Sequence, residues 1–202
     1  MNFEFTNAAI LKFFQDSANA LFVLPGFIAS NEKGVTTTLG RGGSDYTAAI
    51  YGAALQVKAV EIWTDVSGMM TADPRWVPNA KMIPHISYEE AMELSHFGAK
   101  VIYPPTIQPV MKKNIPVWIK NTFAPADYGT LIEKDARNNE NSVRGISSMN
   151  KIALLSLEGS GMIGIPGFSK RLFEALANEN INVVLITQSS SEHSICVAVE
   201  ER

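Results

Sequence analysis

The sequence contains one cysteine in 202 residues, and this scarcity excludes a class of protein. Cys196 has no partner for an intramolecular disulfide, so a small secreted scaffold held by disulfides is excluded. The apolar stretch Ala20 to Leu24 stops at Pro25 and is far too short to cross a bilayer. The first residues also lack the basic-then-apolar layout of a secretory signal. These absences predict a cytoplasmic protein with no membrane partner.

A surplus of positive charge is missing as well. The chain has 17 Lys and Arg residues against 20 Asp and Glu, a net charge of −3, so no general basic field attracts nucleic acid. The three histidines, His85, His96 and His193, are scattered and show no metal-ligand spacing. The sequence therefore predicts neither nucleic-acid binding nor a metal site built by the protein.

The residues that are present predict an α/β protein in two parts. A hydrophobic share of 46% is ordinary for a globular chain and ample for a core. Residues 1–132 form the first part, and the mostly polar residues 133–145 form the clearest linker. Residues 146–202 then restart as a β-α-β-β pattern that stops after its last strand, which predicts an incomplete domain.

Several local patterns predict single elements or side-chain environments. The apolar spacing of Asn7 to Asn19 predicts an amphipathic helix, and Leu21 to Leu24 predicts a short buried strand. Ser87 and Glu90, three residues apart, predict a capping box at the start of a helix. Cys196, inside an alternating apolar run, is expected to be an inert core thiol.

A glycine cluster precedes a helical pattern in the first part. Gly40 to Asp45 reads Gly-Arg-Gly-Gly-Ser-Asp, and the alanine-rich stretch Tyr46 to Gln56 predicts a helix. Consecutive glycines let backbone N–H groups approach an anion, and a helix N-terminus favours negative charge. Arg41 can bind a carboxylate or phosphate through two parallel hydrogen bonds. The same residues also fit a plain glycine turn with Arg41 solvated and Asp45 as a cap.

Other polar residues of the first part are candidate ligand contacts. Thr64 and Asp65 leave a predicted strand, where open α/β sheets bind ligands. Arg75 could reach a polyphosphate, or it could pair locally with Asp73 in a tight turn. Lys100 follows a predicted helix C-cap, where it either neutralises a phosphate or only offsets the helix dipole.

The second part also has a glycine-rich loop before a predicted helix, from Gly159 to Gly167. Such a loop suits the carboxylate of an amino acid, and Gln188, at a strand end, could read the polar groups of the same ligand. The alternative is that these glycines only turn the chain and that Gln188 is solvated.

Four motifs, taken together and in order, resemble the signature blocks of the aspartokinase family. The four motifs are Gly40–Tyr46, Trp63–Gly68, Thr71–Arg75 and Phe97–Val101. The resemblance implies the C-terminal half of an amino-acid-kinase fold, with a mostly parallel sheet and helices on both faces. In the second part, Gly161–Gly167 and Ile186–Ser194 look like the first unit of an ACT domain, here a truncated βαββ unit. It is most similar to threonine-sensitive aspartokinases, which are often fused to a homoserine dehydrogenase.

The family phosphorylates the β-carboxylate of L-aspartate with Mg²⁺-ATP, the first step towards threonine, methionine, isoleucine and lysine. The resemblance implies aspartate contacts, with Asp45 also catalytic, at Arg41, Gly42, Ser44 and Asp45. It implies nucleotide contacts at Thr64, Asp65, Met70, Arg75, Lys100 and Val101. Met70 stands where the family often has a tyrosine. Catalysis is then mainly charge neutralisation of the transferred phosphoryl group by cations and Mg²⁺.

The resemblance also implies feedback control by an amino acid. The expected effector contacts are Gly161, Ile165 and Gln188, with threonine favoured because an amide suits its hydroxyl. Lysine is the alternative, with Glu192 as the acidic partner of its ammonium group. A homodimer or higher assembly is expected to form through the ACT region.

One expected motif is absent from the sequence. The family's Lys-Phe-Gly-Gly-Thr-Ser segment, which supplies a phosphate-binding lysine, occurs nowhere in the 202 residues. The chain is therefore expected to be a fragment with no kinase activity by itself. An alternative is a stand-alone amino-acid-binding or dimerisation module. A glutamate or uridylate kinase fits poorly, because those families lack the ACT-like continuation.

Overall fold

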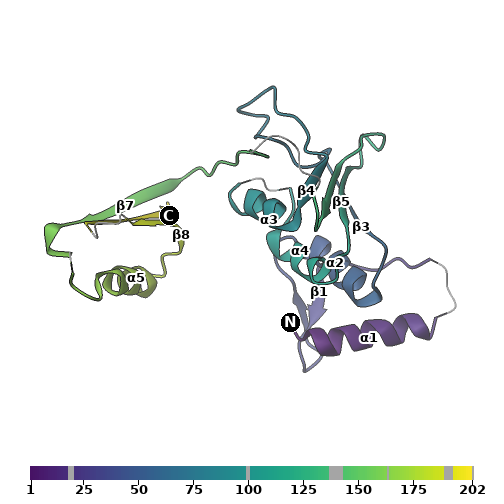
Figure 1. Cartoon of the computed structure of the whole chain (residues 1–202). Helices are drawn as coiled ribbons and strands as arrows, with labels where there is room; N and C mark the ends of the chain where they lie inside the picture. The colour runs from purple at the N-terminus through teal and green to yellow at the C-terminus, as the bar shows by residue number, and fades with distance from the viewer. Residues whose placement is uncertain (18–20, 99–100, 137–142, 163, 189–192, 202) are drawn as a thin grey trace. The chain divides into compact units, whose positions relative to one another are not determined.

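The computed structural model describes residues 1–17, 21–98, 101–136, 143–162, 164–188 and 193–201. The chain divides into two compact units, Met1–Ser148 and Met149–Arg202 (Figure 1). Of the linker predicted at 133–145, residues 137–142 lie outside the described residues. Beyond them the chain still contacts the first unit, because Arg144 Nε lies 3.3 Å from Glu90 Oε1 and Ile146 N donates to Thr71 O.

The first unit alternates helices and short strands. Its helices are α1 (Phe3–Gln15), α2 (Gly43–Leu55), α3 (Tyr88–His96) and α4 (Pro104–Met111). Its strands are β1 (Ile28–Ser30), β2 (Thr36–Thr38), β3 (Val60–Thr64), β4 (His85–Ser87), β5 (Val117–Asn121) and β6 (Thr130–Glu133). Across the described ranges of both units, no helix is long and apolar enough to span a membrane.

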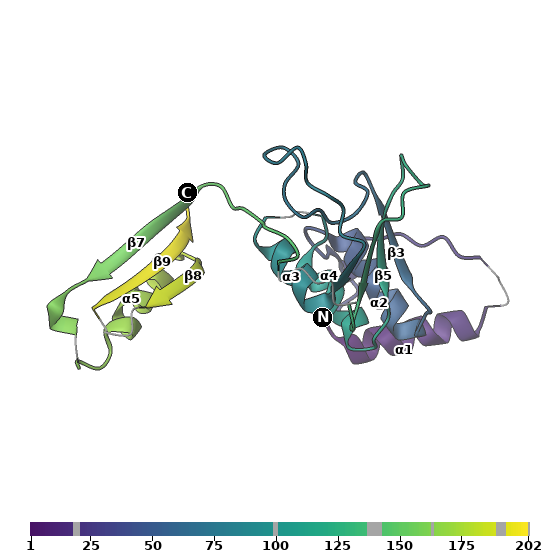
Figure 2. The ribbon, with the colours of Figure 1, turned by 45° about the horizontal axis from the view of Figure 1, so that its top comes forward.

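Four of these strands form one sheet in the order β3-β5-β6-β4. β3 is parallel to β5, and β4 is parallel to β6, whereas β5 and β6 are antiparallel. Alternate residues of the strands, among them Val60, Ile62, Val117 and Ile119, are buried against α2, α3 and α4 on one face (Figure 2). The prediction of an α/β protein with a mostly parallel sheet is confirmed.

The capping box at the start of α3 is confirmed. Glu90 N donates to Ser87 Oγ at 3.1 Å, and Ser87 N donates to Glu90 Oε2 at 2.9 Å. These reciprocal bonds satisfy two backbone donors that the first turn of a helix leaves without a partner. The position of α3 is thereby fixed by residues only three apart in the sequence.

The helix predicted at 7–19 exists but begins earlier, because Asn2 caps it, and it ends earlier, at Gln15. The side chain of Asn2 accepts a hydrogen bond from Phe5 N at 3.1 Å, so α1 starts at Phe3 and ends at Gln15. Residues 18–19 lie outside the described residues. Together with α2, helix α1 forms a second, smaller apolar cluster around Ile10.

The strand predicted at Leu21 to Leu24 is wrong. These residues are not in a strand, and the side chains of Leu21 and Val23 are 83% and 93% exposed. A short apolar run becomes a strand only when another strand pairs with its backbone, and no described strand lies beside it. The first strand of the chain is instead β1, which pairs with β2 as a hairpin.

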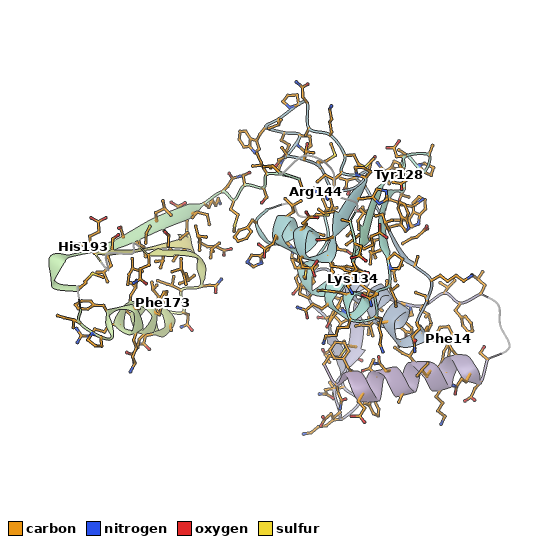
Figure 3. All side chains as sticks on the ribbon, viewed as in Figure 1. Phe14, Tyr128, Lys134, Arg144, Phe173 and His193 are labelled. Atoms are coloured by element: carbon orange, nitrogen blue, oxygen red, sulfur yellow. The ribbon has the colours of Figure 1, made fainter. Side chains whose placement is uncertain are left out.

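The second unit is a three-stranded antiparallel sheet with one long helix. Its elements are β7 (Ile152–Glu158), the 3₁₀ turn η1 (Ser160–Met162), α5 (Phe168–Asn178), β8 (Val183–Gln188) and β9 (Ser194–Glu200). β9 is the central strand and pairs with both β7 and β8 (Figure 2). α5 covers one face, and Phe173, labelled in Figure 3, packs there against Val197 and its neighbours. The predicted β-α-β-β order is confirmed.

Cys196 does not lie in the core under α5, so that prediction is wrong. Ile195, Val197 and Val199 are the residues of β9 that pack against the helix. Because successive side chains of a strand point to opposite faces, Cys196 lies on the other face, where it is half-buried. That face also carries Leu154, which is 70% exposed.

Candidate functional site

The glycine cluster forms a left-handed turn at the start of α2. Gly40 and Gly42 have φ values of 75° and 67°, a region that side chains with a Cβ avoid. Gly42 is the N-cap residue of α2, and no side chain caps this helix. The first backbone N–H groups of α2 therefore have no side-chain acceptor, and together with the helix dipole they favour an anion.

Neighbouring segments hold this turn on two sides. Phe27 N donates to Thr47 Oγ1 at 3.0 Å, which ties the segment before β1 to α2 one turn after its start. On the other side, a Cβ placed on Gly42 would lie 2.3 Å from the Cβ of Tyr103, the N-cap residue of α4. The N-termini of α2 and α4 therefore touch, and position 42 has room only for glycine.

Arg41 and Asp45 lie on this turn with different environments. The Arg41 side chain is exposed, and no ion pair joins it to any residue that the structure describes. Ser44 is also exposed. Asp45, in the first turn of α2, is half-buried, and this burial raises the pKa of its carboxyl group above the ordinary value of 3.8. The turn thus offers a guanidinium to an anion beside a partly desolvated carboxylate.

We expect Asp45→Asn to raise the free energy of unfolding at neutral pH. Because the pKa of Asp45 is raised in the folded state, the folded chain binds more protons than the unfolded chain. The contribution of Asp45 to the free energy of unfolding is therefore fully present below pH 3.8 and is lost as pH rises through the folded-state pKa. The neutral amide does not suffer this loss. Urea unfolding should show a more stable variant at pH 7 and no difference near pH 3. Equal stabilities at both pH values would contradict this expectation.

The turn lies at the carboxyl edge of the parallel strands. Thr64 ends β3, Asn121 ends the parallel neighbour β5, and Thr122 N donates to Thr64 O at 2.8 Å. α2 directly precedes β3 and contacts it, so it runs back along that strand and begins near this edge, and the N-terminus of α4 lies against that of α2. Ligands of open α/β sheets bind outside this edge. The structure therefore brings the Gly42–Asp45 turn and Thr64 to the same end of the sheet.

The other predicted nucleotide contacts have separate local settings. The Thr64 hydroxyl donates to Asp65 Oδ1 at 3.2 Å, and the Asp65 side chain is exposed. Met70 is half-buried and forms a single antiparallel bridge with Met82. Val101 packs against the main core. Lys100 lies outside the described residues.

Arg75 is paired within its own turn. Its guanidinium reaches Asp73 through two nitrogens, Nε at 3.0 Å and Nη2 at 2.6 Å from Oδ2, although the arginine side chain is 79% exposed. The arginine lowers the pKa of the Asp73 carboxyl group through these hydrogen bonds. In this arrangement a phosphate would have to compete with Asp73 for Arg75.

Two polar residues at the same edge, Asn121 and Asp127, were not singled out from the sequence, and Ser67 appeared only as a member of the Trp63–Gly68 motif. Asn121 Nδ2 donates to Ser67 Oγ at 2.9 Å, and Ser67 Oγ donates to Asp127 Oδ2 at 2.5 Å. The one available signal was that Asn121 lies two residues after the apolar run Val117–Ile119. Nothing in the sequence indicated that Ser67 and Asp127, sixty residues apart, would meet.

The second unit contains a cavity of about 290 Å³ beside its glycine-rich loop. The lining residues are Met162, Gly164, Ile165, Pro166, Gly167, Phe168, Ser169, Gln188 and Ile195. Ile165 and Gln188 thus lie together as expected, whereas Gly161 is in η1 and is not among the lining residues. Gly167 is the N-cap of α5, again with no side-chain cap. Glu192, the possible acidic partner, lies outside the described residues.

None of the described residues build a metal centre. No group of three or more His, Cys, Asp or Glu side chains gathers where it could hold an ion. His85 instead contacts Glu133 and Tyr128 on the sheet face away from the helices. A cation at the carboxyl edge would therefore need ligands beyond these side chains, such as the oxygens of a bound phosphate.

Comparison with known proteins gives two family matches. Residues 2–121 match the model of the amino acid kinase family, and residues 155–202 match a model of the ACT domain. The bifunctional aspartokinase/homoserine dehydrogenase of Haemophilus influenzae is 48% identical over 191 residues. That alignment covers 92% of this chain but 23% of the relative, so the chain spans less than a quarter of the relative's length.

Solved structures give the same result. Aspartokinase III of Escherichia coli in complex with lysine and aspartate matches 98% of this chain and 43% of its own, with a TM-score of 0.71 and 39% identity. The same enzyme in complex with aspartate and ADP matches 88% of this chain and 39% of its own, with a TM-score of 0.66 and 42% identity.

Proposed function

The chain belongs to the amino acid kinase family, with an ACT-type second unit and aspartokinases as its relatives, and from this premise we propose that it forms part of an aspartate kinase. The proposed reaction transfers the γ-phosphoryl group of ATP to the β-carboxylate of L-aspartate. The first unit supplies part of the nucleotide and aspartate site, and the second unit supplies feedback control.

The observation that carries this proposal is the arrangement at the carboxyl edge of the sheet. An uncapped helix N-terminus, the exposed guanidinium of Arg41 and the Thr64–Asp65 segment lie at one end of β3 and α2. Backbone donors and a guanidinium suit the carboxylates of aspartate, and polar groups at a strand end suit a nucleoside. The relative from E. coli binds aspartate and ADP, which supports both assignments.

The roles proposed for single residues follow from this arrangement. Arg41, with the backbone of Gly42 and Ser44, holds the aspartate carboxylate, and Asp45 sits beside it in the substrate site. Thr64 and Asp65 contact the adenosine part, while Met70, Arg75, Lys100 and Val101 line the nucleotide pocket. Magnesium arrives with ATP as part of the substrate, bound mainly by phosphate oxygens. A cytoplasmic location stays a proposal that rests on the single cysteine.

We further propose that the cavity of the second unit binds the feedback amino acid, with threonine favoured over lysine. The backbone N–H groups at the start of α5 would take the carboxylate, and the Gln188 amide would take the polar side chain. Among the residues that the structure describes, none that lines the cavity is charged. Lysine's ammonium group would need a carboxylate, whereas threonine's hydroxyl can both donate to and accept from an amide. Lysine stays the alternative, because the E. coli relative binds it.

In the full-length enzyme, Gln188→Ala is expected to leave kinase turnover unchanged and to weaken inhibition by threonine. The inhibitory threonine concentration should rise about tenfold for each 1.4 kcal/mol of lost contact. Gln108→Ala is the matched control, because Gln108 is exposed on α4 of the first unit. Inhibition curves for aspartate kinase with threonine and with lysine would measure both effects. An unchanged threonine curve would refute the site, and lysine inhibition of the unmodified enzyme would refute the choice of effector.

A second candidate function is a stand-alone amino-acid-binding or dimerisation module. The observations that favour it are that every described residue lining the cavity belongs to the second unit and that Leu154 and Leu185 are exposed on its sheet. An apolar sheet face of this kind suits a second copy, and the proposed homodimer would use it. Calorimetric titration of the chain with threonine, aspartate and ATP separates the candidates: binding of threonine alone would favour the module. The homoserine dehydrogenase fusion of the relatives is a proposal for the longer protein.

A further inference from the structure

The loop that follows β3, residues 65–70, is held by the loop that joins β5 to β6, residues 122–129. The first loop begins with Asp65 and ends with Met70, both proposed nucleotide contacts. The second loop contributes none of the residues assigned above. The two loops are about sixty residues apart in sequence, yet hydrogen bonds join the first loop to Asp127 of the second loop and to Thr130, where β6 begins.

At the outer end, a directional chain of hydrogen bonds crosses between the loops. Asn121 Nδ2 donates to Ser67 Oγ, and the Ser67 hydroxyl in turn donates to Asp127 Oδ2. The side-chain oxygen Oδ1 of Asn121 accepts from Phe123 N at 2.9 Å, which fixes the orientation of the side-chain amide. Ser67 is therefore both acceptor and donor, and its side chain has one orientation that satisfies both partners.

At the inner end, the contact is steric as well as polar. Met69 N donates to Thr130 Oγ1 at 2.8 Å, and this hydroxyl donates to Ile83 O at 2.7 Å. A Cβ on Gly68, whose φ is 122°, would lie 2.4 Å from the same Thr130 oxygen. Thr130 is fully buried, so this end of the loop is anchored in the core. The outer end depends on Ser67 and its two partners.

We propose that Asn121 and Asp127 are positioning residues for the nucleotide: through Ser67 they hold the 65–70 loop, and with it Thr64 and Asp65, in the geometry that binds the adenosine part. This inference rests on the proposed function. Asp127 is exposed and contributes nothing to the apolar core. Its removal takes away one of the two partners of the Ser67 hydroxyl without opening a cavity, so the effect falls on loop position rather than on folding.

The test compares Asp127→Ala with Asp127→Asn in the full-length kinase that carries these residues. The alanine variant is expected to raise the KM for ATP about two- to tenfold, the usual effect of one lost hydrogen bond, with kcat and the KM for aspartate unchanged. The asparagine variant keeps an acceptor oxygen for Ser67 and should restore the wild-type KM. Asp135→Ala is the matched control, because Asp135 is exposed beyond the far end of β6 and loses the same charge.

Amide hydrogen exchange of residues 65–70 reads the same contact without any turnover. Exchange in that loop should be faster in Asp127→Ala than in wild type, and Asp127→Asn should return it to the wild-type rate. An unchanged ATP KM in the alanine variant, or an equal rise in both KM values with a lowered Tm, would overturn the positioning role. Absent kinase turnover in the wild-type enzyme would overturn the proposed function instead, and unchanged exchange rates would still overturn the contact between the loops.

Discussion

Arg41→Ala is expected to abolish most of the aspartate kinase activity of the full-length enzyme while nucleotide binding survives. The guanidinium can form two parallel charged hydrogen bonds with a carboxylate, and no described residue competes for it by an ion pair. Losing such a contact costs about 2–5 kcal/mol, or about 30- to 5,000-fold in kcat/KM for aspartate. Steady-state kinetics with aspartate as the varied substrate measure the loss of activity, and calorimetry with ADP measures whether nucleotide binding survives.

Two further variants separate the role of Arg41 from a general loss of charge. Arg41→Lys keeps the charge but not the two-pronged geometry, so it should recover only part of the loss. Lys58→Ala removes one exposed cation near the opposite end of α2 and should behave like wild type. If kcat/KM for aspartate were unchanged in Arg41→Ala, the assignment of this residue would be wrong.

A polypeptide of these 202 residues alone is expected to show no aspartate-dependent release of ADP. Phosphoryl transfer depends on cations around the transferred group. In the described part of the edge, Arg41 is unpaired but Arg75 is already bound to Asp73. The Lys-Phe-Gly-Gly-Thr-Ser segment expected to supply a phosphate-binding lysine does not occur in the sequence.

A coupled assay for ADP release with saturating Mg²⁺-ATP and aspartate tests this expectation. The full-length enzyme, assayed in parallel, is the positive control. A rate of about 1 s⁻¹ or more from the 202-residue chain, the scale of an ordinary kinase, would show that these residues suffice for catalysis. Calorimetric binding of ADP to the same chain would separate a missing catalytic group from a missing nucleotide pocket.

Predictions that depended on neighbours in the sequence were the most accurate. The Ser87–Glu90 capping box spans three residues, and its two hydrogen bonds form as the spacing indicated. The glycine turn before α2 depends on backbone freedom at Gly40 and Gly42, which is a property of the residue type. The strand that Thr64 and Asp65 were expected to leave is β3, whose residues Val60 and Ile62 are buried on one face.

Predictions that depended on distant partners failed or could not be made. Leu21 to Leu24 has the composition of a strand, but strand formation requires a second strand beside it. Cys196 lies within an apolar run, yet which face of β9 meets α5 is decided by the packing of the helix. For Arg75, the sequence left open a phosphate contact or a pair with Asp73, and the structure shows the pair.

Local patterns in the sequence specify the α/β class, the βαββ order of the second part and the turn that opens α2, because periodicity, caps and glycines act over a few residues. The sequence also indicated the family, through four short motifs in a fixed order. Only the tertiary structure decided what lies together at the carboxyl edge. Ser67 meets Asp127 because the parallel register of β3 and β5 carries both loops to the same end of the sheet. No periodicity in a chain encodes such a pairing, since it exists only after strands sixty residues apart have found each other.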